Sequence, residues 1–198
     1  MTNNIVYHSD DKIYINLTNQ CDNNCDFCIR NHTDDVFGYN LWLQNEPTAQ
    51  DIIKELEKYD LSRYLEVVYC GFGEPTFKMD VIKEVSRYLK KFNIKKRINT
   101  NGHGNLINER SIVDELISSV DIINVSLNEV DSKAYDSICH SIYGEEGFDA
   151  MIDFAKQCVK AGAEVVLSVV DCVPKETIKK AQMIANEIGA HLRVREMT

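Results

Sequence analysis

A short apolar run, Ile13-Tyr14-Ile15-Asn16-Leu17, leads into the stretch Cys21-Asp22-Asn23-Asn24-Cys25-Asp26-Phe27-Cys28. The apolar run predicts a β-strand, and the cysteines then stand in the loop that follows it. Thiolates are soft ligands that select iron–sulfur clusters or zinc over hard cations. Ordinary electron-transfer clusters use four cysteines, so three at this spacing predict a cluster whose fourth iron is open to a non-protein ligand.

Composition is that of an ordinary globular protein: 198 residues, 44% of them hydrophobic and 27% charged. Residues 1–198 are expected to form a single domain. The formal net charge of −9 argues against binding to nucleic acid or to an anionic membrane. No secretory signal and no run of about 18 apolar residues is visible, so a cytoplasmic protein is expected. In that compartment, seven cysteines are more often metal-bound or buried than disulfide-bonded.

Strands and helices are expected to alternate along the chain. Six strand-like segments cover residues 12–18, 64–70, 96–100, 121–128, 163–171 and 191–196. Helices are expected from Pro47, over 79–92, after Ser111, over 131–139 and 148–160, and from Pro174 to Gly189. Thr48 with Asp51, and Ser111 with Asp114, have the spacing of residues that cap helix N-termini.

This alternation predicts an α/β fold of parallel βα units with right-handed crossovers. Two architectures fit: an open doubly wound sheet, or a partial (β/α)6 barrel with outer helices. Six units fall short of a complete eight-unit barrel, which favours the partial barrel. In either case ligands gather at the carboxyl ends of the strands. The three cysteines, the segment 71–76, Asn101, Ser126 and Asn128 all follow or end strands, which predicts one active site.

These features resemble the radical S-adenosylmethionine (SAM) superfamily. The C-x3-C-x2-C spacing after a first strand, with Phe27 before the last cysteine, is similar to that family's cluster motif. Phe72-Gly73-Glu74-Pro75-Thr76 resembles its G-G-E-P motif, although Phe72 stands where a glycine is usual. More narrowly, the short length and the segments 17–21, 28–32, 70–76 and 97–102 resemble the small TatD-linked (TatD family-associated) radical SAM proteins.

The resemblance implies a cofactor pair. Cys21, Cys25 and Cys28 would hold a [4Fe-4S] cluster, and SAM would bind the fourth iron through its amino and carboxylate groups. An electron from a donor such as flavodoxin or ferredoxin would then cleave SAM to methionine and a 5′-deoxyadenosyl radical, which abstracts hydrogen from an unknown substrate, a small molecule or a peptide. The cofactors would supply the difficult chemistry and the protein the placement.

The resemblance also implies roles for residues near the cluster. Gly73 and Glu74 would face the methionine amino group, and Phe27 would lie by the adenine. Ser126 and Asn128 would reach ribose hydroxyls or the methionine carboxylate; their other interpretation is as strand-end and turn residues. Asn99 and Asn101 are further candidates for the same pocket. Arg193 or Arg195 would bind the SAM carboxylate; the alternative is that both arginines are simply exposed at the surface.

The remaining cysteines lack paired metal spacing and are expected to be buried; they are Cys70, Cys139, Cys158 and Cys172. Cys70 and Cys172 lie near expected strand ends, where a second role beside substrate is the alternative to simple burial. The basic run 90–97 sits at a helix C-terminus, where cations complement the helix dipole. Docking of an acidic electron donor there is a hypothesis.

Three other functions stay open. One is an activating enzyme or maturase for a protein or peptide, admitted through the open side of an incomplete barrel. Another is a small-molecule enzyme of the deazapurine-forming kind. The third is a binding protein without catalysis, stabilised by zinc held by the three cysteines and a fourth ligand such as His32.

Overall fold

The main sheet of the computed structural model, which describes residues 3–171 and 173–196, has strand order β1-β2-β5-β6-β7-β8-β9. The edge strand β1 (Val6–Ser9) pairs antiparallel with β2 (Lys12–Ile15). The other neighbours pair in parallel: β5 (Glu66–Tyr69), β6 (Lys95–Thr100), β7 (Ile122–Ser126), β8 (Glu164–Val170) and β9 (His191–Arg195). Six parallel strands thus follow one another in chain order, as in a sector of a (β/α) barrel, so the partial barrel is confirmed.

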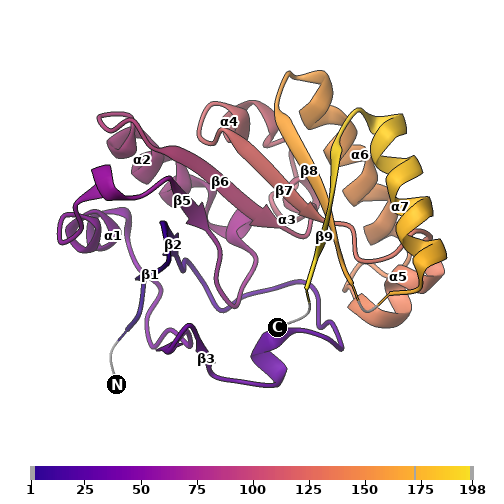
Figure 1. Cartoon of the computed structure of the whole chain (residues 1–198), viewed down its shortest axis with the longest axis horizontal. Helices are drawn as coiled ribbons and strands as arrows, with labels where there is room; N and C mark the ends of the chain where they lie inside the picture. The colour runs from indigo at the N-terminus through magenta and orange to yellow at the C-terminus, as the bar shows by residue number, and fades with distance from the viewer. Residues whose placement is uncertain (1–2, 172, 197–198) are drawn as a thin grey trace.

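Helices connect the parallel strands and lie along one side of the sheet (Figure 1). The longer ones are α1 (Ala49–Leu56), α2 (Met79–Leu89), α6 (Glu146–Lys160) and α7 (Lys175–Ile188). Shorter helices are α3 (Gly104–Ile107), α4 (Val113–Ile117) and α5 (Ser132–Cys139), with 3-10 turns η1 (Ile29–Asn31), η2 (Leu61–Arg63) and η3 (Pro75–Lys78). Within the described ranges, no helix combines the length and apolarity needed to cross a membrane.

One of the two capping predictions is confirmed. Thr48 caps α1, and its side chain and that of Asp51 exchange hydrogen bonds with each other's backbone N–H groups. The pairing of Ser111 with Asp114 is wrong, because α4 begins one residue later and its N-cap, Ile112, makes no side-chain cap bond. Ile112 is fully buried and its N–H donates to the Asn105 side chain at 2.9 Å, which places the turn by packing rather than by a serine cap.

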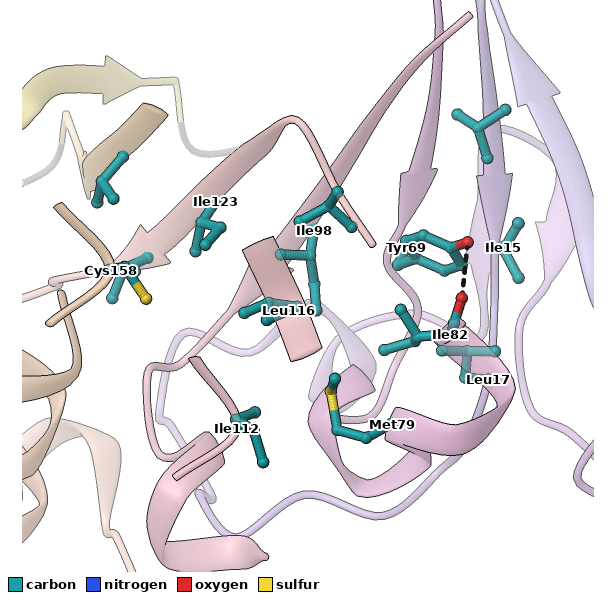
Figure 2. Packing of buried hydrophobic residues seen from close by; sticks show 14 of the residues in the cluster. Ile15, Leu17, Tyr69, Met79, Ile82, Ile98, Ile112, Leu116, Ile123 and Cys158 are labelled. Atoms are coloured by element: carbon teal, nitrogen blue, oxygen red, sulfur yellow. Dashed lines mark hydrogen bonds between the residues drawn. The ribbon is translucent and has the colours of Figure 1, made fainter. Parts of the chain in front are cut away.

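Side chains alternate along each parallel strand between two different environments. The face toward the helices is apolar, and its residues join one buried cluster that includes Ile15, Val67, Ile98, Ile123 and Leu167. Figure 2 shows Ile15, Ile98 and Ile123 with the helix residues Met79, Ile82 and Leu116, and the Tyr69 hydroxyl donating to the Ile82 carbonyl at 3.4 Å. Burial of this face fixes which residues of each strand point away from the helices.

The long segment between β2 and α1 carries the three cysteines and lies near the carboxyl ends of the strands (Figure 1). It includes a small hairpin, β3 (Asp35–Val36) with β4 (Tyr39–Asn40). Its start is tied to its end, since the Asn16 amide donates to the Leu41 carbonyl at 2.7 Å. Its middle is tied to α5, since the Asn24 N–H donates to the Cys139 carbonyl at 2.9 Å.

Candidate cofactor-binding site

Cys21, Cys25 and Cys28 line one cavity of about 240 Å³ at the carboxyl ends of the strands. Other predicted residues line the same cavity. Phe27 comes from the cysteine segment, and the rest come from the ends of neighbouring strands: Gly73, Glu74, Asn99, Asn101, Ser126, Asn128 and Arg195, together with Cys70 and Gly71. The structure therefore brings residues from five chain segments into one site, as the positions of the motifs at strand ends predict.

The three thiols are half-buried and none forms a disulfide. Burial raises the pKa of Cys21 to about 12 and also raises the pKa of Cys28. For Cys25, a hydrogen bond with the Cys139 thiol and burial together raise the pKa. A positively charged metal centre stabilises the thiolate form, so these thiols would ionise on binding metal.

The donor set suits a soft metal cluster: three free thiols open into the same cavity. They are not gathered at metal–ligand distances, since no cluster of three or more potential ligand side chains within the described residues is placed to hold a metal ion. The Cys25 thiol in particular faces Cys139. To ligate a metal cluster, Cys25 would have to exchange its contact with Cys139 for a metal bond.

A buried polar network fixes the start of the cysteine loop. Asp22 is fully buried and receives a hydrogen bond from the Asn101 amide at 2.6 Å, while its second oxygen lies 2.5 Å from His103 Nδ1. His103 Nε2 lies 2.9 Å from the Gly147 carbonyl oxygen on α6. The Asn23 amide donates to the Tyr135 hydroxyl on α5 at 3.0 Å. No motif in the sequence marks Asp22 or His103 as partners, and they are 81 residues apart.

Gly73 passes so close to the cysteine segment that no side chain fits. A Cβ atom there would lie 2.4 Å from the Thr18 carbonyl oxygen and 2.5 Å from that of Gln20. The Glu74 N–H donates to the same Gln20 carbonyl at 2.7 Å. At Gly71, a Cβ would lie 2.0 Å from the Asn16 side-chain oxygen. Gly73 therefore lets the two motif segments meet along their backbones, and Gly71 leaves room for the Asn16 side chain.

Glu74 is almost completely buried and its carboxylate accepts four hydrogen bonds from the protein. Oε1 accepts from the Thr76 N–H at 3.0 Å and from the hydroxyls of Thr76 and Thr100, both at 2.7 Å. Oε2 accepts from the Asn101 N–H at 2.7 Å. Burial nevertheless raises the pKa of this carboxyl. Glu74 therefore joins the end of β5 to the end of β6 as well as lining the cavity.

Phe72, the departure from the two-glycine pattern, points away from the cysteines. It is buried in a small separate cluster with Tyr7 and Leu41 and is not among the residues that line the cavity. Its ring meets Trp42 edge to face, with centroids 5.1 Å apart. The phenylalanine thus anchors the segment between β2 and α1, and Gly71 and Gly73 on either side of it face the cavity.

Ser126 and Asn128 reach the cavity from the end of β7. Asn128 has φ of 59°, in the left-handed region that asparagine tolerates better than most residues. Its amide donates to the Cys139 sulfur at 3.5 Å, and its buried side-chain oxygen has no hydrogen-bond partner. That unsatisfied oxygen marks a place where a bound ligand can donate a hydrogen bond.

The remaining candidates divide by position. Cys139 and Cys158 are fully buried, as predicted, and Cys70 is half-buried at the cavity wall; Cys172 lies outside the described residues. His32 is exposed, with Nε2 3.3 Å from the Asp26 carbonyl oxygen, and it is not among the residues that line the cavity. Lys90 and Lys91 precede β6 and Lys95 is its first residue, so these basic residues lie at the opposite end of the sheet from the cysteines.

Comparisons with solved structures find the same fold in larger proteins. SuiB of Streptococcus suis bound to its precursor peptide SuiA matches with a TM-score of 0.73 and 22% identity, covering 98% of this chain and 40% of that one. SuiB bound to S-adenosylmethionine matches with a TM-score of 0.69 and 25% identity, over 90% and 39% of the two chains. A radical SAM methyltransferase from Sphaerobacter thermophilus matches with a TM-score of 0.68 and 16% identity, covering 96% of this chain and 57% of that one.

This chain therefore spans between about two fifths and three fifths of the length of those proteins. No curated protein matches the sequence. The family profile described as the Radical SAM superfamily matches residues 15–188, which is most of the chain and includes all three motif cysteines and the Gly73-Glu74-Pro75 segment. The chain belongs to the radical SAM superfamily.

Proposed function

We propose that this chain is a radical SAM enzyme in which Cys21, Cys25 and Cys28 hold a [4Fe-4S] cluster. The observation that carries the proposal is the opening of these three free thiols into one cavity, in a chain of this superfamily. Such a cluster supplies one-electron cleavage of SAM and, through the radical released, removal of a hydrogen atom from substrate. The chain's own residues position the ligands and exclude water.

Residues of the cavity wall suit the different parts of SAM. Backbone carbonyls beside Gly73 and the carboxylate of Glu74 would face the cationic amino group of the methionine moiety. Ser126 and Asn128 would bind the ribose or the carboxylate, and the unpaired Asn128 oxygen is an acceptor for a ribose hydroxyl. Phe27, half-buried at the cavity edge, would lie against the adenine ring.

The substrate is proposed only by class. SuiB, which shares the fold, was crystallised with a precursor peptide, and this favours a peptide as one candidate. A small molecule is the other candidate, and a second cavity with polar walls beside the cysteine site favours it. We further propose that residues 1–198 act as one radical SAM core domain of the TatD-linked kind, and that an electron donor such as flavodoxin or ferredoxin reduces it.

Spectroscopy of the reconstituted protein tests this proposal. Protein reconstituted anaerobically with iron and sulfide is expected to bind about four irons per chain, and its reduced electron paramagnetic resonance signal should change when SAM is added. Cys25→Ala should lose the cluster, while Cys158→Ala, a buried cysteine in the core away from the cavity, should keep it. Zinc without iron, or a cluster that ignores SAM, would overturn the proposal.

A further inference from the structure

A second cavity, of about 270 Å³, adjoins the cysteine site on the side of the sheet away from the helices. The two cavities share four wall residues: Cys70, Asn99, Ser126 and Arg195. The rest of the second wall is polar as well, and comprises Tyr14, Arg97, Asn124, Ser168 and Arg193. A molecule held here lies directly beside the site at which SAM is proposed to bind.

The polar residues of this cavity come from neighbouring parallel strands of the sheet. Ser126 pairs in register with Ser168, and Ser168 pairs with Arg193, so these three side chains form a row across β7, β8 and β9. Arg97 and Asn99, and Asn124 and Ser126, alternate with apolar residues in the same way. Interior faces of parallel strands are ordinarily filled by branched apolar residues. Polar side chains at positions where apolar residues are usual indicate that this face binds a polar ligand.

The three arginines of the cavity differ in their partners. Arg97 is neutralised: its Nε and Nη2 donate to the two oxygens of Glu66, both at 3.0 Å, and its Nη1 donates to Asn99 at 2.9 Å. Side-chain ion pairs of the described residues include Arg97 and Arg110 but neither Arg193 nor Arg195. Within the part of the chain that the structure describes, neither guanidinium group at the cavity wall has a carboxylate ion-pair partner; Arg193 is exposed and Arg195 is half-buried.

The positive charges of the three arginines affect the pKa values of two other residues in the cavity wall, Tyr14 and Cys70. Burial raises the pKa of Tyr14, and the charges of Arg97 and Arg193 oppose that rise. Burial also raises the pKa of Cys70, which the charges of Arg97 and Arg195 oppose. Glu66 and Glu74 are nearby carboxylates that already accept hydrogen bonds from the protein, and Asp171 also lies beside β9, since its N–H donates to the Arg195 carbonyl at 2.9 Å.

We propose that Arg193 and Arg195 bind an oxyanion, a carboxylate or a phosphate, carried by a small-molecule substrate that occupies the second cavity. A guanidinium presents parallel N–H donors that match either group. Neutral donors and acceptors from Asn124, Ser126 and Ser168 would surround the rest of the molecule. The proposal rests on the proposed radical SAM function and adds to it the chemical class of the substrate.

Arginine modification by phenylglyoxal, followed by peptide mass spectrometry, tests the proposal on the reconstituted protein. The probes are inorganic phosphate and acetate, each added separately with SAM present. At least one probe is expected to slow modification of both Arg193 and Arg195, while Arg87, exposed on α2, reacts at an unchanged rate. Protection by phosphate alone indicates a phosphorylated substrate, and protection by acetate alone indicates a carboxylic acid; protection by both supports the shared oxyanion chemistry.

Variants of the arginines provide a second test, which measures the affinity for the protective probe. Arg193→Gln is expected to weaken binding of the protective probe about tenfold, as loss of a hydrogen bond to a charged group does, and Arg193→Lys should weaken it less. Arg87→Gln is the matched control and should not change it. Equal modification with and without both probes would overturn the proposal, as would full protection of both arginines by SAM alone, since the pair would then belong to SAM.

Formation of 5′-deoxyadenosine in the same samples separates this proposal from the one on which it rests. Product without any anion protection leaves the radical SAM function standing and removes the oxyanion site. Anion protection without product keeps the arginine site as a binding site and removes the catalytic function.

Discussion

The Asp22 carboxylate lies 2.5 Å from His103 Nδ1, and neither side chain is exposed to solvent. Asp22 follows the first motif cysteine, and His103 follows the strand β6. Through this contact, and through the bond from Asn101 to Asp22, the cysteine segment is fixed to the carboxyl end of the sheet. The positions of the thiols thus depend on residues that are far from them in sequence.

Removal of Asp22 is expected to destabilise the protein strongly. Asp22→Ala leaves His103 and the Asn101 amide without their buried acceptor, at a cost of about 3 kcal/mol in the free energy of unfolding. Asp26→Ala is the matched control, since Asp26 also pairs with a histidine, His140, but at the surface. Its cost should stay below about 1 kcal/mol. Urea unfolding measures both, and equal costs would refute a special role for the buried pair.

A side chain at Gly73 is expected to separate the two motif segments. The Cβ of Gly73→Ala would collide with the carbonyl oxygens of Thr18 and Gln20, and backbone cannot move aside as a flexible side chain can. We expect a loss of about 1–3 kcal/mol in stability and reduced iron binding. Gly144→Ala is the control for iron binding: its φ of 58° makes alanine costly to stability, but a Cβ there meets nothing within 4 Å, so its iron content should be unchanged. Normal iron content in Gly73→Ala would show that the close approach is dispensable.

Loss of the Glu74 carboxylate is expected to affect folding as well as SAM binding. Glu74→Ala leaves the hydroxyls of Thr76 and Thr100 and two backbone N–H groups without an acceptor, which should cost about 3 kcal/mol or more. Glu57→Ala, at an exposed position after α1, serves as the control and should be nearly neutral. Thermal unfolding without SAM is the measurement, and a stable Glu74→Ala protein would assign this residue to ligand binding alone.

The contact between Cys25 and Cys139 makes a distinct prediction about the cluster ligands. If only the three motif cysteines bind the cluster, Cys139→Ala should retain the iron content of the unchanged protein, whereas Cys25→Ala should lose it. Both substitutions remove one thiol from the same contact, so they are matched. Iron analysis after anaerobic reconstitution decides between them. Loss of iron from Cys139→Ala would identify Cys139 as a fourth ligand and contradict the cluster with an open position.

Sequence periodicity predicts the main architecture well, because each strand and helix buries one face. The strands expected at 12–18, 64–70 and 96–100 overlap β2, β5 and β6, and the expected helices 79–92 and 148–160 overlap α2 and α6. Short elements without a full apolar period were missed, namely β1, the β3–β4 hairpin and α3. Their placement depends on pairing with β2, on the conformation of the cysteine segment and on tertiary contacts.

Only those residues of the candidate site that belong to a sequence motif could be predicted. The cysteines and the Gly73-Glu74 segment follow strands, and parallel strands bring such ends together. Partners that meet only in three dimensions leave no local signal: His103 reaches Asp22 from 81 residues away. The second cavity did leave a signal, since polar residues alternate with apolar ones in Arg97-Ile98-Asn99 and Asn124-Val125-Ser126.

The formation of 5′-deoxyadenosine is the most direct test of the account. Protein reconstituted with iron and sulfide is supplied anaerobically with SAM and a strong reductant, and the nucleoside is quantified by mass spectrometry. The account predicts product with the unchanged chain and with Cys158→Ala, and none with Cys21→Ala, Cys25→Ala or Cys28→Ala. Absence of product from a fully loaded cluster, or undiminished product from a motif cysteine variant, would contradict it.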